Sequence, residues 1–214
     1  MPSIAATIIA FKSMTDTQKA SVVSALNRGE IIAYPTDTIY GLGVDIYNED
    51  AVAKLTGLKG RDRDKPVSVL FADVERLLIE FPQLNAWQSA VVRRLLPGRI
   101  TLILPVPAHQ RFSPLFVSEG YVGARVVDLP VLNEILVRFG KPISTTSINP
   151  GGAPPALNAA QINRYFANRI AIILDNGQAG KQASTILKIR DHSYEILRSG
   201  SVSPEEIERI LSTL

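Results

Sequence analysis

Strand-like and helix-like patterns intermix along this chain without strict alternation, and this order restricts the folds open to it. Apolar strand patterns fall at 4–11, 30–34, 67–71, 100–106, 121–126, 143–146, 170–174, 184–189 and 194–197, and helical patterns at 16–29, 49–58, 73–80, 85–96, 131–139, 158–166 and 204–211. A doubly wound parallel sheet needs a helix after nearly every strand. The observed order therefore predicts an α/β protein with a twisted mixed sheet and flanking helices.

Helix starts are expected where a short polar side chain can accept a hydrogen bond from the first helical turn. The residues in such positions are Asp16, Asn48, Asp73, Asn85, Asn158 and Ser203. We find neither an internal repeat nor a Pro/Ser-rich linker that would divide the chain. The sequence predicts a single domain over residues 1–214.

Composition excludes several classes of site. With 46% hydrophobic residues the chain has enough apolar side chains for a core, and its net charge of +3 permits an anionic ligand or RNA. The absence of cysteine excludes disulfides, thiolate nucleophiles and thiolate zinc sites. His109 and His192 have no metal-ligand spacing, so we expect no protein-held metal site. No segment approaches the ~20 apolar residues of a membrane span and no basic leader is present, which predicts a cytoplasmic protein.

A row of cations occupies every second position from Lys59 to Lys65, with Arg61 and Arg63 between them. In extended backbone, residues at i and i+2 share a face, so the row can present its charges on one side. Several donors facing one way suit a polyphosphate. The alternative is an exposed loop in which the two intervening aspartates neutralise the row.

Polar residues gather where apolar strands end, at 36–38, at 144–149, at 184–185 and at Arg198. Such residues often satisfy the backbone of turns, which is the simpler interpretation of each group alone. Arg125 lies inside the apolar run VGARVV, where an unpaired guanidinium would be costly to bury. It is either an edge-strand arginine with a structural carboxylate partner or part of a binding site.

The common nucleotide and hydrolase motifs are missing. The chain has no G-x-G-x-x-G after a strand, no G-x-x-x-x-G-K-[ST] and no G-x-S-x-G. An enzyme built from these residues would work by charge and positioning more than by covalent or acid–base chemistry.

Taken in order, seven segments form a specific combination. They are YPTDTIYGLG, LKGRDRDKPVSVL, PGRITLIL, VGARVVD, PISTTSINPGG, STIL and ILRSG. This combination resembles the YrdC-like (TsaC) family of threonylcarbamoyl-adenylate synthases over about residues 16 to 203. The resemblance implies a YrdC-like fold with an open, concave, positively charged groove.

The resemblance also implies an activity. Family members make threonylcarbamoyl-AMP and pyrophosphate from L-threonine, bicarbonate or CO2, and ATP with Mg²⁺. A downstream threonylcarbamoyl-transferase complex then modifies an adenosine of tRNA, so contact with tRNA can be indirect. No membrane is involved.

Site residues follow from the motif positions. The catalytic residues implied are Lys59, Arg61, Ser147 and Asn149. Those implied in ATP binding are Lys59, Arg61, Lys65, Ser147, Asn149 and Arg198. Those implied in threonine binding are Thr36, Thr38, Arg125, Thr145 and Ser184.

The chain departs from the family pattern at several positions. Asp62 and Val127 stand where prolines are usual, Leu70 where many members have a histidine, and Lys188 where an aspartate is common. Two other functions therefore stay open. One is an RNA-binding or RNA-maturation module without turnover, and the other is a paralogue that acts on a related carbamoyl adduct.

Overall fold

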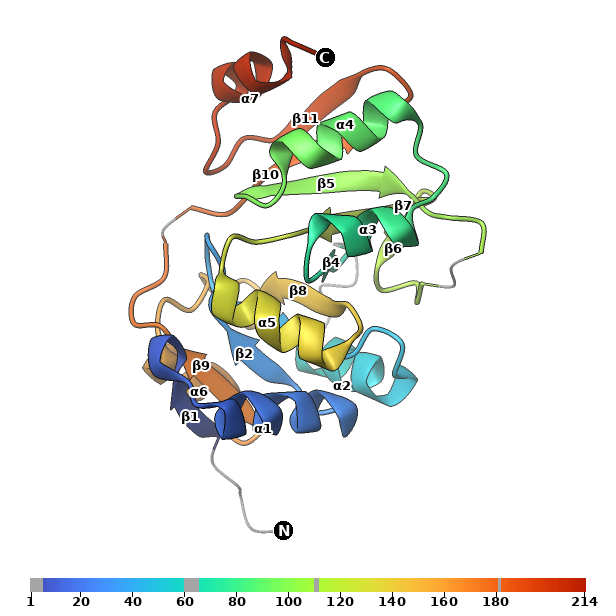
Figure 1. The fold of residues 1–214 in the computed structure, drawn as a ribbon. Helices are drawn as coiled ribbons and strands as arrows, with labels where there is room; N and C mark the ends of the chain where they lie inside the picture. The colour runs from blue at the N-terminus through green and yellow to red at the C-terminus, as the bar shows by residue number, and fades with distance from the viewer. Residues whose placement is uncertain (1–5, 60–65, 110–111, 181) are drawn as a thin grey trace.

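The computed structural model describes residues 6–59, 66–109, 112–180 and 182–214, with only the main chain described at Lys59 (Figure 1). Its helices are α1 (Asp16–Asn27), α2 (Glu49–Lys59), α3 (Val74–Glu80), α4 (Ala86–Leu95), α5 (Pro130–Phe139), α6 (Ala159–Phe166) and α7 (Pro204–Leu211), with a 3-10 turn at Phe11–Ser13. Its strands are β1 (Thr7–Ala10), β2 (Ile32–Tyr34), β3 (Gly41–Gly43), β4 (Ser68–Leu70), β5 (Ile100–Pro105), β6 (Val117–Ser118), β7 (Tyr121–Arg125), β8 (Ile143–Ser147), β9 (Ile172–Asp175), β10 (Thr185–Ile189) and β11 (Tyr194–Arg198).

The strands form one mixed sheet in the order β1-β9-β2-β3-β8-β4-β7-β5-β10-β11, with β6 paired to β7. The parallel pairs are β1–β9, β9–β2, β4–β7 and β5–β10. The remaining pairs are antiparallel, so the predicted mixed α/β sheet is confirmed. Each parallel pair joins strands that are distant in the sequence.

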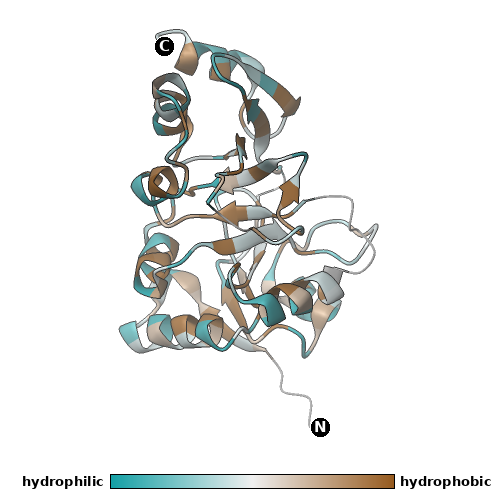
Figure 2. Ribbon diagram, turned by 90° about the vertical axis from the view of Figure 1, so that its right-hand side faces the viewer, coloured by the Kyte–Doolittle hydropathy of each residue, from teal (hydrophilic) through white to brown (hydrophobic). Residues whose placement is uncertain are grey.

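Alternation along the strands supplies both faces of the sheet. In β2, Ile32 and Tyr34 belong to the core cluster with α1 and α5, while Ala33 belongs to the cluster with α2 and α6. Successive strand residues point to opposite faces, so these two helix pairs cover opposite faces of this half of the sheet. Helices α1 and α5 lie side by side (Figure 1). Figure 2 shows apolar residues concentrated along the strands and polar residues along the outer helix surfaces.

The helix starts largely follow the predicted caps. The side chains of Asn48, Asp73, Asn85, Asn158 and Ser203 each accept a hydrogen bond from a main-chain N–H in the first turn. The prediction for α1 was one residue off, because Thr15 is the cap. Thr15 and Gln18 form a reciprocal capping box, which a prediction centred on Asp16 overlooks.

Strand β3 is one of two described strands that the sequence patterns did not predict, the other being the two-residue β6. The residues of β3 are Gly41, Leu42 and Gly43, and glycine is unfavourable inside strands. Here the buried Tyr34 ring lies against the strand: a Cβ on Gly43 would come within 2.7 Å of the ring and 2.9 Å of the Ile143 side chain. Close packing therefore requires glycine at this position.

The first predicted strand is also shorter than expected. The pattern at 4–11 gives strand β1 only at Thr7–Ala10, after which Phe11 begins the 3-10 turn. Residues 4 and 5 lie outside the described residues.

Candidate functional site

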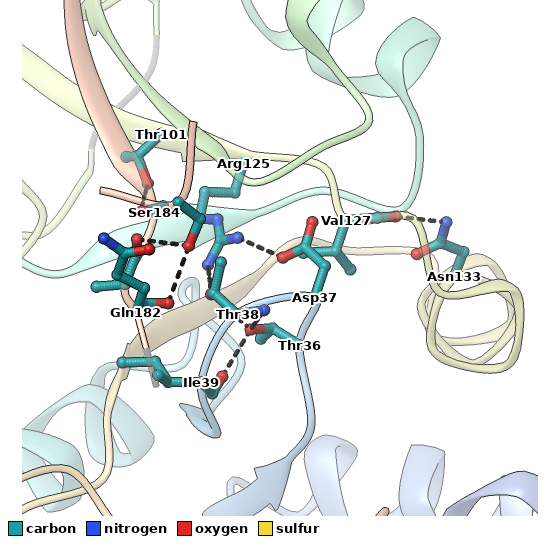
Figure 3. A network of polar contacts seen from close by, with 12 residues as sticks. Thr36, Asp37, Thr38, Ile39, Thr101, Arg125, Val127, Asn133, Gln182 and Ser184 are labelled. Atoms are coloured by element: carbon teal, nitrogen blue, oxygen red, sulfur yellow. Dashed lines mark hydrogen bonds and ion pairs between the residues drawn. The ribbon is translucent and has the colours of Figure 1, made fainter. Parts of the chain in front are cut away.

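The turn that joins β2 to β3 forms one wall of the site. The Thr36 hydroxyl donates to the carbonyl of Ile39 at 2.6 Å and accepts from the main-chain N–H of Thr38 at 3.1 Å. The two threonine hydroxyls are 3.0 Å apart. These contacts fix the turn and leave Asp37 and Thr38 beside the end of β7 (Figure 3).

Arg125, the last residue of β7, lies at the centre of the network in Figure 3. Its side chain is only 7% exposed, and its Nη2 donates to Asp37 Oδ1 at 2.7 Å. Its Nη1 lies 3.4 Å from the Thr38 hydroxyl. Among the described residues, neither Arg125 Nε nor Asp37 Oδ2 has a hydrogen-bond partner, although both atoms are buried. A buried guanidinium with an unused donor can donate a hydrogen bond to a further anionic or polar group.

Burial and charge act in opposite directions on Asp37. Removal from water raises the pKa of its carboxyl group, and the positive charge and hydrogen bond of Arg125 lower it by less. The ion pair with Arg125 therefore offsets only part of the cost of burying the Asp37 carboxylate. Arg125 has the carboxylate partner that one alternative expected, but β7 pairs with β4 and β5 on its two sides, so the expected edge-strand position is wrong. Its binding role stays a prediction, and its Nε remains an unused donor among the described residues.

Ser184 and Arg198 approach the same network from the C-terminal strands. The Ser184 hydroxyl lies 2.8 Å from that of Thr101 at the start of β5. Arg198, the last residue of β11, donates from Nη2 to the Ser184 carbonyl at 2.8 Å. Partial burial lowers the pKa of the Arg198 guanidinium, and the positive charge of Arg125 lowers it further. Two guanidinium groups from different strands thus face one region, which favours an anion between them.

The segment after β9 packs on the turn from the opposite side. The Tyr40 hydroxyl donates to the Gly177 carbonyl at 2.9 Å and accepts from the Asn176 N–H at 2.8 Å. Gly180 lies so close that a Cβ there would be 2.3 Å from the Thr38 carbonyl oxygen. A polar cavity of about 70 Å³ lies between this segment and the turn. The two segments therefore support each other's main chain.

Strand β8 supplies the other end of the site. Register pairs Leu70 with both Arg125 and Ile143, so Ile143 is level with Arg125 across the sheet. Ser147, at the end of β8, pairs with Gly41, which also pairs with Tyr34, so Ser147 lies beside the turn that joins β2 to β3. Its hydroxyl donates to Asn149 Oδ1 at 2.7 Å, and Asn149 donates to the Ala153 carbonyl at 3.0 Å. Thr145, which is buried, lies between the two ends.

The described part of the chain covers only some of the predicted cations. Arg61, Arg63 and Lys65 lie outside it, and so does the side chain of Lys59. The main chain of Lys59 is helical, and Lys59 is the last residue of α2. The extended row expected from Lys59 onward is therefore wrong at its first position, because the helix reaches that residue.

The structure brings together four of the five residues expected to bind threonine, namely Thr36, Thr38, Arg125 and Ser184, and adds Arg198 to them. It also hydrogen-bonds Ser147 to Asn149, and Ser147 pairs with Gly41 shortly after the 36–38 turn. Sequence reasoning missed Thr101 and Tyr40 as members of the network, and it included Asp37 in the polar group at 36–38 without giving it a role. The signal for Asp37 was its place between two threonines in the turn, combined with the need of a buried arginine for a carboxylate.

Two of the positions that depart from the family pattern make contacts elsewhere. Lys188 lies 3.7 Å from Glu119 and 4.1 Å from the centre of the Tyr121 ring. The Val127 carbonyl accepts from Asn133 at 2.9 Å. Neither side chain takes part in the Arg125 network.

Two kinds of feature are missing from the described residues. We find no cluster of three or more His, Cys, Asp or Glu side chains arranged to hold a metal ion there. No helix in those residues has the length and apolar character needed to cross a bilayer.

Comparison with known proteins gives consistent results. The model of the Sua5/YciO/YrdC family, described as "Telomere recombination", matches residues 24–200. The threonylcarbamoyl-AMP synthase of Photobacterium profundum is 35% identical over 84% of this chain and 97% of its own length. That of Bacillus subtilis is 32% identical over 94% of this chain, which spans 59% of the relative's length.

Solved structures agree. P. abyssi Sua5 in complex with L-threonine superposes with a TM-score of 0.86 at 26% identity, over 95% of this chain and 60% of that chain. E. coli YciO gives a TM-score of 0.81 at 19% identity and shows the same fold over 98% of its length. The chain belongs to the Sua5/YciO/YrdC family.

Proposed function

We propose that this protein is a threonylcarbamoyl-AMP synthase. It makes threonylcarbamoyl-AMP and pyrophosphate from L-threonine, bicarbonate or CO2, and ATP, and is therefore a nucleotidyltransferase. The observation that carries the proposal is the buried Arg125 with an unused Nε donor, set between a threonine-rich turn and Ser184. Relatives named as threonylcarbamoyl-AMP synthases support it.

Threonine occupies the Arg125 end of the site. Its carboxylate binds Arg125, with the charge of Arg198 nearby to favour an anion. The hydroxyls of Thr36, Thr38, Thr145 and Ser184 provide donors and acceptors for the amino and hydroxyl groups of the substrate. The crystal structure of P. abyssi Sua5 complexed with L-threonine, a protein of similar fold, supports this assignment.

ATP occupies the Ser147 end. Lys59, Arg61 and Lys65 bind the triphosphate, and Ser147 and Asn149 donate to phosphate or carbamate oxygens. Arg198 contacts the nucleotide from the threonine side.

The chemistry explains the need for cations. A carbamate oxygen on the threonine nitrogen attacks the α-phosphorus, a new P–O bond forms, and the bond to the bridging oxygen breaks to release pyrophosphate. Two anions approach each other and a third leaves. Fixed positive groups lower such a barrier by about 3–4 kcal/mol for each well-placed donor.

Mg²⁺ accompanies the nucleotide. The carboxylate of the described Arg125 network belongs to Asp37, and it is already paired with Arg125. The residues present therefore fit a Mg²⁺ held mainly by phosphate oxygens and water, as is usual for this ion, and it neutralises phosphate charge when bound.

The product serves tRNA threonylcarbamoyladenosine synthesis in the cytoplasm. A downstream threonylcarbamoyl-transferase complex receives it, so contact with tRNA is indirect. We further propose that residues 1–214 act as one domain whose site is an open, positively charged groove.

The decisive assay measures pyrophosphate release from ATP by the purified protein. We expect release only when threonine and bicarbonate are both present, and little release when serine replaces threonine as the sole amino acid. Pyrophosphate release that does not depend on threonine would refute threonine as the substrate. Salt-sensitive RNA binding without any pyrophosphate would refute the enzymatic function and favour an RNA-binding module.

A further inference from the structure

A second cleft, of about 820 Å³, lies between α1, α2 and the start of β9. These three elements are in the lower part of Figure 1. The cleft is at the opposite strand ends from the site described above. Ile31 and Ile172 line the cleft, whereas Tyr34 and Asp175 at the far ends of β2 and β9 lead into the Arg125 side. Three residues of strand separate the two sites by ~10 Å or more. The cleft is within the size range of small-molecule pockets.

The floor of the cleft is aliphatic. It is formed by Ile31, Leu58, Ile170 and Ile172, each of which is mostly buried. Among the described residues that line the cleft there is no aromatic side chain. An aliphatic chain can therefore gain contact area here, whereas a nucleobase has no ring to stack against.

The walls carry an excess of positive charge. Arg28, Lys54 and Arg169 line the cleft together with one carboxylate, Glu30, so the balance is +2. Arg28 is committed to that carboxylate through two bonds of 2.9 Å. Within the described residues, no carboxylate lies within ion-pair distance of Lys54 or Arg169.

Main-chain contacts hold these two cations in place. Lys54 Nζ donates to the Gly29 carbonyl at 3.0 Å, and Arg169 Nη2 donates to the Gly57 carbonyl at 2.9 Å. These bonds satisfy carbonyls near the C-terminal ends of α1 and α2. Each uses one donor, which leaves two N–H groups on the lysine and four on the arginine. The cations are thus positioned, and most of their donors remain available.

We propose that this cleft is a second binding site for a soluble aliphatic molecule that ends in one carboxylate or phosphate group. The aliphatic chain lies on the isoleucine and leucine floor, and the anionic group bridges Lys54 and Arg169. The site does not depend on the threonine and nucleotide chemistry proposed for the other face.

The test is an NMR titration of the ¹⁵N-labelled protein with octanoate and, in parallel, with 1-octanol. We expect octanoate to shift amides at Gly57 and at 168–172 and to bind more tightly than octanol. Raising the salt concentration should weaken octanoate and leave octanol unchanged. Equal affinity for the two ligands, or shifts around Arg125 instead, would overturn the proposal, and neither result requires a variant.

The variant arm uses Lys54→Gln with Arg169→Gln, since glutamine keeps an N–H for the two carbonyls. We expect octanoate binding to weaken at least about tenfold, the cost of losing a charge-assisted hydrogen bond. Arg209→Gln on α7, exposed and far from the cleft, is the matched control and should bind as the wild type does. Unchanged binding in the double variant contradicts the inference. So does binding to phosphatidylglycerol vesicles without binding to octanoate, which would indicate a membrane surface.

Discussion

Replacing Arg125 by methionine tests how the buried pair is balanced. Methionine is similar in length but has no charge, so the Asp37 carboxylate is left in a buried position without its countercharge. Breaking a buried ion pair from one side costs about 3–5 kcal/mol. For a chain of this size 1 kcal/mol corresponds to about 2–4 °C, so we expect a fall in Tm of about 6–20 °C at neutral pH. Urea unfolding followed by circular dichroism measures the free energy directly.

The loss should depend on pH. Burial raises the pKa of Asp37 above the ordinary 3.8, and without Arg125 only a main-chain hydrogen bond and the charge of Arg99 offset part of that rise. A carboxyl group with a raised folded-state pKa contributes stability that is complete below the unfolded value and is lost as the pH rises through the folded value. The difference between wild type and Arg125→Met should therefore be smallest near pH 4 and widen toward pH 7.

A second substitution completes the cycle. Adding Asp37→Asn to Arg125→Met removes the stranded charge and should restore most of the lost stability, since both partners are then neutral. Asp37→Asn alone should cost less than Arg125→Met alone, because burial already disfavours the ionised carboxylate. If the two single effects simply add, and the loss is the same at pH 4 and pH 7, the reasoning about this pair is wrong.

Four further substitutions test other parts of the structure. Gly180→Ala puts a Cβ 2.3 Å from the Thr38 carbonyl oxygen, so it should cost about 1–3 kcal/mol in urea unfolding and raise the KM for threonine. Thr185→Val removes a buried hydroxyl that donates to one carbonyl and accepts from two N–H groups, and should cost about 2 kcal/mol or more in the same assay. Lys59→Ala and Arg61→Ala should each abolish pyrophosphate release while leaving Tm within about 2 °C of the wild type.

Matched controls separate these effects from general damage. Gly57→Ala places a Cβ where nothing lies within 4 Å and should leave stability equal or improve it by about 1 kcal/mol. Arg209→Ala removes an exposed cation and should leave pyrophosphate release unchanged. An unfolded Lys59→Ala variant would assign that lysine a structural role, and a fully stable Gly180→Ala would refute the close packing of the two segments.

Sequence patterns were sufficient for most of the fold because caps and periodicity agree along this chain. Most helices from α2 to α7 begin at capping residues that can be recognised in the sequence, and the strand boundaries follow apolar runs. Strand β3 was not predicted because its two glycines are required by close packing against the Tyr34 ring, and no local sequence pattern reveals that contact. The pairing of β10 with β5 is likewise a long-range contact that sequence order alone does not specify.

The site was predictable in its residue types and less so in its connections. Arg125, Thr38 and Ser184 were expected, and they lie in one network. Two contacts depend on how distant loops meet. One is the ion pair between Asp37 and Arg125, and the other is the hydrogen bond from Tyr40 to the segment after β9. Such contacts follow from packing, which periodicity does not encode.

The strand order also determines when this site can exist during synthesis. Strand β9 returns to pair with β1 and β2, and the next strand, β10, joins β5 at the other end of the sheet. A nascent chain that has reached only β9 lacks both Ser184 and Arg198. Because pairings over such separations form slowly, the Arg125 region gains its last wall only after β10 and β11 have been synthesised. The Arg125 network can thus be completed only after the growing chain has extended past Arg198.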